Sequence, residues 1–163
     1  MTLAMLFIPA ITITLISLCA CIHYEALQRC NAMLPQLRLH NKRAKVLAAV
    51  GAAMVSHFLQ IGLFAAALYF LQHYADLGYI GGNFKNTAFS FLYFSTETYT
   101  SLGFGDVFPL GHIRMVAGME ALTGLVMISW TASFTYLEMS RYWRPDSRKT
   151  ARSLLIRKKA MTP

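Results

Sequence analysis

Residues 96–109 read Thr-Glu-Thr-Tyr-Thr-Ser-Leu-Gly-Phe-Gly-Asp-Val-Phe-Pro and lie between two long apolar segments. Hydroxyl groups, alternating glycines and two carboxylates occur here, where lipid would otherwise require an unbroken helix. Backbone that is not helical is tolerated at membrane depth only where it lines water or is buried in protein. The stretch therefore predicts a polar loop inside a membrane protein, and it decides how the segments on both sides of it fold.

The composition of the 163-residue chain supports this prediction. Hydrophobic residues make up 56% of the chain and charged residues 13%, and the mean hydropathy is positive. A soluble domain carries about 25% charged residues, whereas here the charges gather in two segments and leave the apolar runs almost uncharged. We predict an all-α membrane protein with three transmembrane helices and one re-entrant helix.

Three apolar segments are long enough to cross about 30 Å of hydrocarbon as helices: residues 3–22, 46–71 and 113–137. A cleaved signal peptide is the alternative for the first segment, but it needs a basic start, and no Lys or Arg precedes Arg29. Residues 72–86 are predicted to form a loop. Residues 87–99 are too few to span, so with Asn86 as N-cap they predict a helix that enters the membrane and stops halfway.

The basic residues predict the orientation. Of the 15 Lys and Arg residues, five lie in residues 23–45 and eight follow Glu138, whereas residues 72–114 hold only Lys85 and Arg114. The positive-inside rule then gives a cytoplasmic C-terminus and an external N-terminus, in a multi-pass protein of the cell inner (plasma) membrane. We expect both basic segments to contact the anionic headgroups of the lipid bilayer and no nucleic acid. After Pro35, an interfacial helix and a solvated connector are both open.

The chemistry of residues 100–106 suits a cation. Gly103 and Gly105 can adopt backbone angles closed to other residues, so successive carbonyl groups can point toward one axis. A cation at that axis can be the partner that these carbonyls lack in the membrane. Ser101 adds a hydroxyl, and the C-terminal end of the preceding helix favours positive charge.

The run Thr100-Ser101-Leu102-Gly103-Phe104-Gly105-Asp106 resembles the potassium-channel signature Thr-Thr-Val-Gly-Tyr-Gly-Asp. Glu97 stands where bacterial potassium channels carry a pore-helix glutamate, and Phe108-Pro109 is similar to the aromatic-proline pair that ends their filter loop. Residues 46–137 resemble the two-transmembrane pore domain of that family. They comprise an outer helix (46–71), a pore helix (87–99), a filter (100–106) and an inner helix (113–137), with 1–45 and 138–163 outside the domain.

The resemblance implies a homotetrameric, potassium-selective channel. Its selectivity filter would comprise Thr100, Ser101, Leu102, Gly103, Phe104 and Gly105. K⁺ would be bound by the carbonyls of Ser101, Leu102, Gly103 and Phe104 and by the Ser101 hydroxyl.

Three residues would support the filter on this resemblance. Glu97 and Asp106 would share a proton, and the Tyr93 hydroxyl would bond Asp106. Ser101, Leu102 and Phe104 replace the family's Thr, Val and Tyr and soften the filter. A weakly selective monovalent cation channel and a nonconducting membrane partner or scaffold are therefore the alternatives. We expect no enzyme activity, no small-molecule substrate and no cofactor besides the permeant K⁺.

Three residues outside the filter have two readings each. Gly124 is a candidate hinge of the inner helix or a site of close helix packing. Glu120, an ionisable residue within a span, either bonds pore-helix hydroxyls while protonated or pairs with Arg114, or else senses protons. His57 is a candidate pH sensor or is satisfied by Gln60 or a neighbouring helix. The three cysteines, Cys19, Cys21 and Cys30, predict neither a disulfide nor a metal site.

Overall fold

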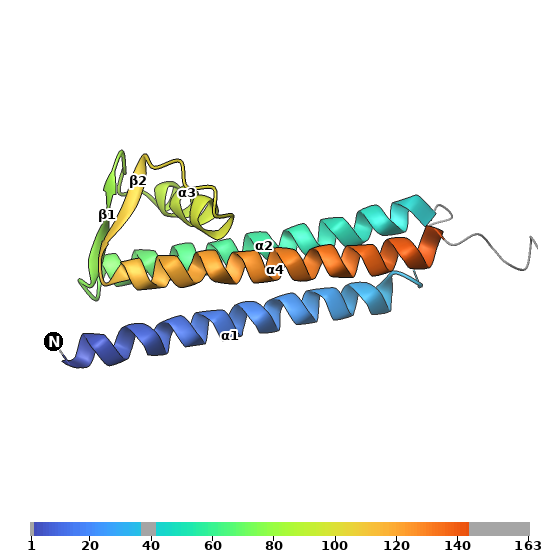
Figure 1. Cartoon of the computed structure of the whole chain (residues 1–163), viewed down its shortest axis with the longest axis horizontal. Coiled ribbons are helices and arrows are strands. Elements are labelled where there is room, and N and C mark those ends of the chain that lie inside the picture. The colour runs from blue at the N-terminus through green and yellow to red at the C-terminus, as the bar shows by residue number, and fades with distance from the viewer. Residues whose placement is uncertain (1, 37–41, 144–163) are drawn as a thin grey trace, which may run out of the picture.

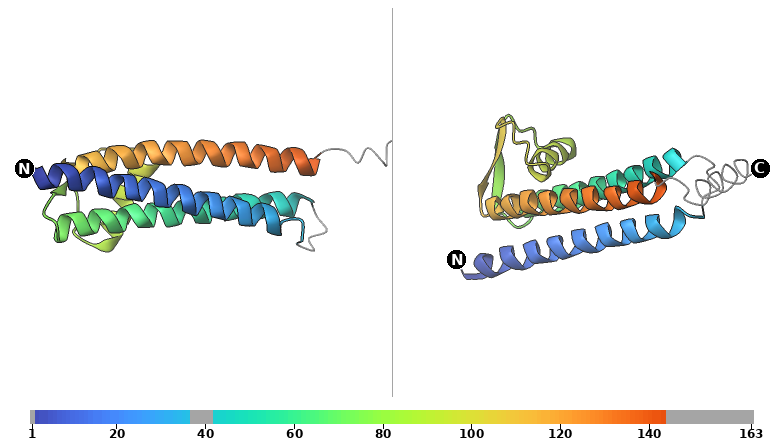
Figure 2. Two further views of the ribbon diagram at one scale, coloured as in Figure 1. Left: turned by 90° about the horizontal axis from the view of Figure 1, so that it is seen from below. Right: turned by 45° about the vertical axis from the view of Figure 1, so that its right-hand side comes forward.

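A computed structural model describes residues 2–36 and 42–143. Along the chain the elements are α1 (Thr2–Met33), α2 (Lys42–His73), β1 (Gly78–Gly82), α3 (Ala88–Tyr99), β2 (Val107–Gly111) and α4 (Ile113–Trp143). The three long helices lie side by side, with α1 packed against both α2 and α4 (Figures 1 and 2). The short helix α3 and both strands lie at one end, on the side of α2 and α4 that faces away from α1 (Figure 1).

Among the described residues, three helices are long and apolar enough to cross a membrane: Leu6–Met33, Arg43–His73 and Ile113–Arg141. The predicted all-α membrane fold is confirmed in its three candidate spans and its short additional helix. The three spans differ from the short helix in length, because α3 has only 12 residues, too few to cross the hydrocarbon.

The predicted boundaries are wrong at several helix ends. Residues 23–45 were expected to form a cytoplasmic linker, yet α1 continues to Met33 and α2 already begins at Lys42. Good helix formers and an ion pair of 3.2 Å between Glu25 and Arg29, one turn apart, favour the continued helix. The inner helix likewise extends beyond residue 137, to Trp143. Residues 37–41, where an interfacial helix was considered, lie outside the described part, as does most of the basic tail.

The two strands were not predicted. β1 lies in the expected loop and pairs antiparallel with β2, in a register that joins Gly78 to Gly111 and Gly82 to Val107. Glycine-rich segments have low strand propensity, so the pairing depends on contacts between distant residues. A Cβ at Gly82 would lie 2.2 Å from the Asp106 carbonyl oxygen, so glycine permits the close approach that holds the end of the filter loop.

The pore helix α3 begins one residue later than predicted. Thr87, and not Asn86, is its N-cap, and the Thr87 hydroxyl accepts a hydrogen bond from the Ser90 N–H at 3.3 Å. The Asn86 amide instead lies 3.0 Å from Nε2 of His73, at the end of α2. Capping by a hydroxyl or an amide is chemically equivalent, and the contact with α2 decides between the two residues.

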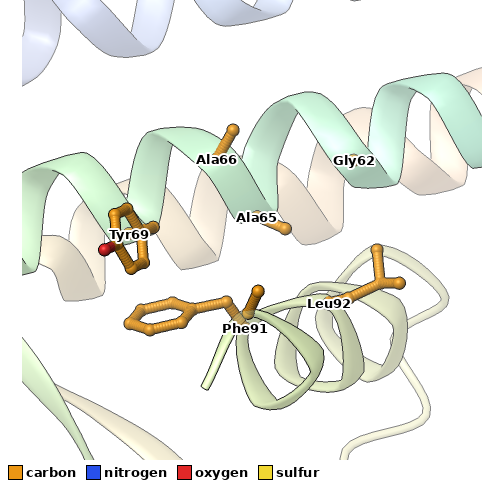
Figure 3. A pocket seen from close by; sticks show the side chains of 7 residues that line it. Gly62, Ala65, Ala66, Tyr69, Phe91 and Leu92 are labelled. Carbon is orange, nitrogen blue, oxygen red and sulfur yellow. The ribbon is translucent and has the colours of Figure 1, made fainter. Parts of the chain in front are cut away.

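The hydrophobic core joins α3 to α2 and α4, the two helices that lie between α3 and α1 (Figure 1). Buried apolar side chains come from all four helices and both strands and include Phe64 and Leu68 of α2, Phe91 and Phe94 of α3, and Val116 of α4. Small residues of α2 leave an apolar groove against α3, which is lined by Gly62, Ala65, Ala66, Tyr69, Ala88, Phe91 and Leu92 (Figure 3). This packing fixes α3 against α2 and aims its C-terminal end at the filter loop.

Candidate functional site

The filter loop has an alternating backbone conformation. Ser101, Gly103 and Gly105 have φ angles of 56°, 52° and 83°, whereas the two residues between them are not in the left-handed region. Alternation of left- and right-handed residues places successive N–H groups on one side of the chain. The sequence led us to expect this freedom at the glycines only. Ser101 shows that a residue with a side chain adopts it as well, at the cost that a non-glycine residue has there.

The N–H groups of the filter loop converge on Glu97. The N–H groups of Leu102 and Gly103 donate to the Glu97 carbonyl at 2.9 and 3.4 Å, and the Phe104 N–H donates to Glu97 Oε2 at 3.4 Å. All peptide bonds of the described residues are trans, so each carbonyl points away from the N–H of its own peptide unit. The carbonyls of residues 101–103 therefore face away from Glu97, along an exposed stretch of chain.

Glu97 is buried, with 4% of its surface exposed. Burial raises the pKa of its carboxyl above the ordinary value; the hydrogen bond from the Phe104 N–H lowers it, and the charge of Asp106 raises it. No hydrogen bond joins Glu97 to Asp106 among residues 2–36 and 42–143, so the two interact through space. A shared proton between them stays a prediction.

Asp106 is attached at two points. The Tyr93 hydroxyl lies 3.2 Å from both carboxylate oxygens of Asp106 and donates to them. The Asp106 carbonyl accepts from the Asn83 N–H at 2.8 Å. The side chain thus links the end of the filter to α3, and the backbone links it to the segment that follows β1.

Thr100 ends the pore helix. It is the C-cap of α3, and both its N–H and its hydroxyl contact the Thr96 carbonyl, at 3.1 and 2.8 Å. The Thr100 hydroxyl therefore satisfies the helix end. The Ser101 N–H, bonded to the Thr98 carbonyl at 3.0 Å, continues this turn into the filter.

Gly124 lies where α4 touches the end of α3. A Cβ at this position would lie 1.9 Å from the Tyr99 carbonyl oxygen. A Cβ added at Gly118, nearer the start of α4, would have no atom within 4 Å. The geometry gives Gly124 a role in close packing, and its role as a hinge stays a prediction.

Glu120 is fully buried on α4 and contacts the hydroxyl of Ser95 on α3. The same hydroxyl lies 2.9 Å from the Ile61 carbonyl, which can only accept. Because a serine has one proton to donate, that proton goes to Ile61, and the proton between Ser95 and Glu120 belongs to the carboxyl. Glu120 is thus held in its neutral form. In the described residues its partner is Ser95, not Arg114.

His57 is buried and contacts two neighbouring helices. Its Nδ1 lies 3.0 Å from the Tyr99 hydroxyl and its Nε2 lies 2.9 Å from the Thr131 hydroxyl. Gln60, the neighbour considered as its partner, instead accepts from the Tyr99 hydroxyl at 2.8 Å. The structure therefore places His57 at the base of the pore helix, beside the start of the filter.

Sequence reasoning did not identify Tyr99, Gln60, Thr131 and His23 as site residues. Tyr99 was passed over as an ordinary pore-helix residue, and His23 was assigned to a linker. One signal was available: Ser56 and Gln60 are four residues apart, which puts two polar side chains on one face of a membrane span. Polar residues that share a face at this depth indicate a buried partner.

The comparisons with known proteins agree with this architecture. A family model described as an ion channel matches residues 46–139, which is more than half of the chain. The match covers nearly all of α2 and α4, and all of α3 and the filter loop, but it leaves out α1. Neither a curated protein nor a solved structure matches the chain.

Proposed function

The chain belongs to the ion-channel family, and we propose that four copies of it form a potassium-selective channel. K⁺ would pass between the four filter loops, with its hydration shell replaced by the carbonyls of Ser101, Leu102, Gly103 and Phe104 and by the Ser101 hydroxyl. One loop supplies only a quarter of each oxygen ring. The proposal therefore requires a homotetramer.

The alternating backbone of the filter is the observation that supports this proposal most. It turns the N–H groups of residues 102–104 toward Glu97 and the carbonyls of residues 101–103 to the opposite side. Unpaired carbonyls at membrane depth need a partner. A dehydrated monovalent cation supplies that partner for several carbonyls at once.

The exposed side chains of the filter support an assembly of several copies. Leu102 and Phe104 are 60% and 66% exposed in the single chain. The filter loop that carries them follows α3, on the side of the fold away from α1 (Figure 1). A neighbouring copy placed around the ion axis would cover these side chains. Its contacts with them would then support a filter that Ser101, Leu102 and Phe104 make softer than the family signature.

The membrane placement is part of the proposal. We expect the filter at the outer face of the cell inner (plasma) membrane, the N-terminus outside and the C-terminus in the cytoplasm. The basic segments would contact anionic headgroups. On this account the chain needs no cofactor besides the permeant K⁺, binds no nucleic acid or small-molecule substrate, and catalyses no reaction.

A reversal-potential measurement tests the selectivity. The purified protein is reconstituted in liposomes with K⁺ on one side and Na⁺ on the other. We expect the reversal potential to follow the K⁺ gradient. A potential that follows Na⁺ equally would favour the weakly selective channel, for which the exposed, hydroxyl-free Phe104 is the supporting observation. Absence of flux under every condition would favour a nonconducting scaffold.

Gly103→Ala tests the filter assignment. Gly103 has φ of 52°, and a methyl group added there would have open space around it, so alanine meets only the backbone penalty, about 1–2 kcal/mol for each copy. We expect flux to be lost. Gly51→Ala is the control, because Gly51 also has open space but lies in the ordinary helix α2. Flux that is unchanged by Gly103→Ala would show that the filter assignment is wrong.

A further inference from the structure

Five polar side chains, four of them buried, close a ring of hydrogen bonds that joins all four helices. The Tyr99 hydroxyl lies 2.8 Å from Gln60 Oε1 and 3.0 Å from His57 Nδ1. The Thr131 hydroxyl lies 2.9 Å from His57 Nε2 and 3.3 Å from His23 Nε2. His23 Nδ1 lies 3.2 Å from Gln60 Nε2, which closes the ring. We call these five residues the histidine ring.

A backbone carbonyl decides the direction of the ring. Gln60 Nε2 lies 3.1 Å from the Ser56 carbonyl, which can only accept. The amide nitrogen of Gln60 therefore faces Ser56 and His23, and its oxygen faces Tyr99. Tyr99 must then donate to Gln60, and because a phenol has one proton, His57 Nδ1 donates to Tyr99.

The remaining protons follow in order. A neutral His57 with its proton on Nδ1 has an acceptor at Nε2, and Thr131 donates to it. The Thr131 oxygen then accepts from the Nε2–H of His23, and His23 Nδ1 accepts from the Gln60 amide. Each member donates once and accepts once around the ring, so every bond is made only while both imidazoles are neutral. Hydrogen bonds in such a chain strengthen one another.

The surroundings favour the neutral state. His23 and Gln60 are 0% exposed and Tyr99 is 1% exposed, and charge is costly at this depth. Besides the ring's own histidines and Tyr99, the titratable groups that face it among the described residues are Cys19 on α1 and Glu120 on α4. Burial holds the pKa of the Tyr99 phenol above its ordinary value. The phenol therefore keeps the proton that it donates.

One member of the histidine ring, Tyr99, lies directly before the filter. Tyr99 is the last residue of α3, and Thr100 and Ser101 follow it directly. His23 belongs to α1, which lies outside the family match and on the far side of α2 and α4 from α3 (Figure 1). The imidazole of His23 thus connects α1, through side chains of α2 and α4, to Tyr99, the residue directly before the filter.

We infer that His23 is a positioning residue for the filter, and that the histidine ring holds the end of α3 in place only while both imidazoles are neutral. The inference rests on the proposed function, since its consequence is a change in ion selectivity. An added proton on His23 Nδ1 faces the Gln60 amide nitrogen at 3.2 Å, which cannot accept it, and the Ser56 hydroxyl at 3.3 Å. An added proton on His57 Nε2 takes the place of the proton that the Thr131 hydroxyl donates there. Either proton breaks one bond of the ring and, because hydrogen bonds in such a chain strengthen one another, weakens the remaining bonds that hold Tyr99.

Substitutions of His23 test the inference through the pH profile of selectivity. Glutamine offers an acceptor oxygen and a donor N–H but takes up no proton, whereas leucine offers neither. In liposomes, wild-type K⁺ over Na⁺ selectivity should fall by roughly threefold or more between pH 7.5 and pH 3.5, the effect of one lost buried hydrogen bond. His23→Gln should keep wild-type selectivity at pH 7.5 and lose the pH response. His23→Leu should be poorly selective at both pH values.

His112→Gln is the matched control, because His112 is exposed directly before α4. This variant should respond to pH as the wild type does. A pH response that persists in His23→Gln, or wild-type selectivity in His23→Leu, would overturn the inference. Loss of the response in His112→Gln would assign it to a different histidine and overturn the inference as well.

Imidazole ¹⁵N chemical shifts test the ring without ion flux. In the wild-type protein in lipid at pH 7.5, we expect a neutral His23 protonated at Nε2 and a neutral His57 protonated at Nδ1. These tautomers in a protein that passes no ions would support the ring and contradict the proposed function. A charged His23, or one protonated at Nδ1, in a protein that selects K⁺ would contradict the ring alone.

Discussion

Gly124→Ala should disturb the joint between the inner helix and the end of the pore helix. The new methyl carbon would lie 1.9 Å from the Tyr99 carbonyl oxygen, 2.8 Å from its carbonyl carbon and 3.1 Å from Cδ1 of its ring. Two of these atoms belong to the backbone and have no rotamer that avoids the clash. The end of α3 or the facing turn of α4 must therefore move, by about 1.5 Å if a normal contact near 3.4 Å is to be restored.

A second glycine on the same helix isolates the cost of this clash. Gly118→Ala introduces a methyl group with nothing within 4 Å of it. Both substitutions gain about 1 kcal/mol from the higher helix propensity of alanine, and this gain cancels in the comparison. The remaining difference is the overpacking at Gly124, about 1–3 kcal/mol for each copy.

Thermal unfolding of the two variants in one detergent measures this difference, and reversal potentials in liposomes measure its effect on the filter. We expect Gly124→Ala to unfold at a lower temperature than Gly118→Ala and to discriminate less well between K⁺ and Na⁺. Equal unfolding temperatures together with wild-type selectivity would refute the packing argument. Equal unfolding temperatures with wild-type selectivity but a changed open fraction would favour the hinge instead.

Two buried carboxyls give further predictions. Burial raises the pKa of Glu97, so the neutral form is favoured in the folded protein, and the free energy of unfolding should fall as the pH rises from about 4.5 through the raised value. Glu97→Gln should lack this part of the pH dependence, and an unchanged slope would contradict the assignment. Ser95→Ala removes the hydrogen-bond partner of buried Glu120 and should cost about 1–3 kcal/mol. Glu120→Gln can still donate to Ser95, so its free energy of unfolding should lie within about 1 kcal/mol of the wild-type value. A larger loss of stability in Glu120→Gln than in Ser95→Ala would contradict a neutral Glu120.

The parts of the fold that depend on local sequence could be predicted. The spans follow from the apolar runs, and the left-handed backbone at Gly103 and Gly105 follows from two glycines at alternate positions in one stretch of chain. The left-handed conformation of Ser101 could not be predicted, because nothing in a serine favours it. It results from the converging bonds of neighbouring N–H groups to Glu97, which exist only in the folded loop.

The parts that depend on distant contacts could not be predicted. His23 bonds partners 37 and 108 residues away, and no local pattern connects these positions. The basic residues after α1 predicted a linker, because Lys and Arg gather in loops on the cytoplasmic side. Glu25 and Arg29, however, are spaced to stabilise a helix. The pairing of β1 with β2 was missed for the same reason: glycine-rich strands form only when a partner strand is present.

The supports of the filter are distributed differently from what the sequence of the filter alone suggests. Phe104 lacks the hydroxyl with which the tyrosine of the potassium-channel signature braces the filter against the pore helix. Here the pore helix has polar contacts on its buried side, where Ser95 contacts Glu120 and Tyr99 bonds both Gln60 and His57. A filter with weaker side-chain bracing needs a pore helix whose end cannot shift. Since α1 supplies one member of the histidine ring, the helix outside the family match is expected to matter for selectivity although it lies far from the ion axis.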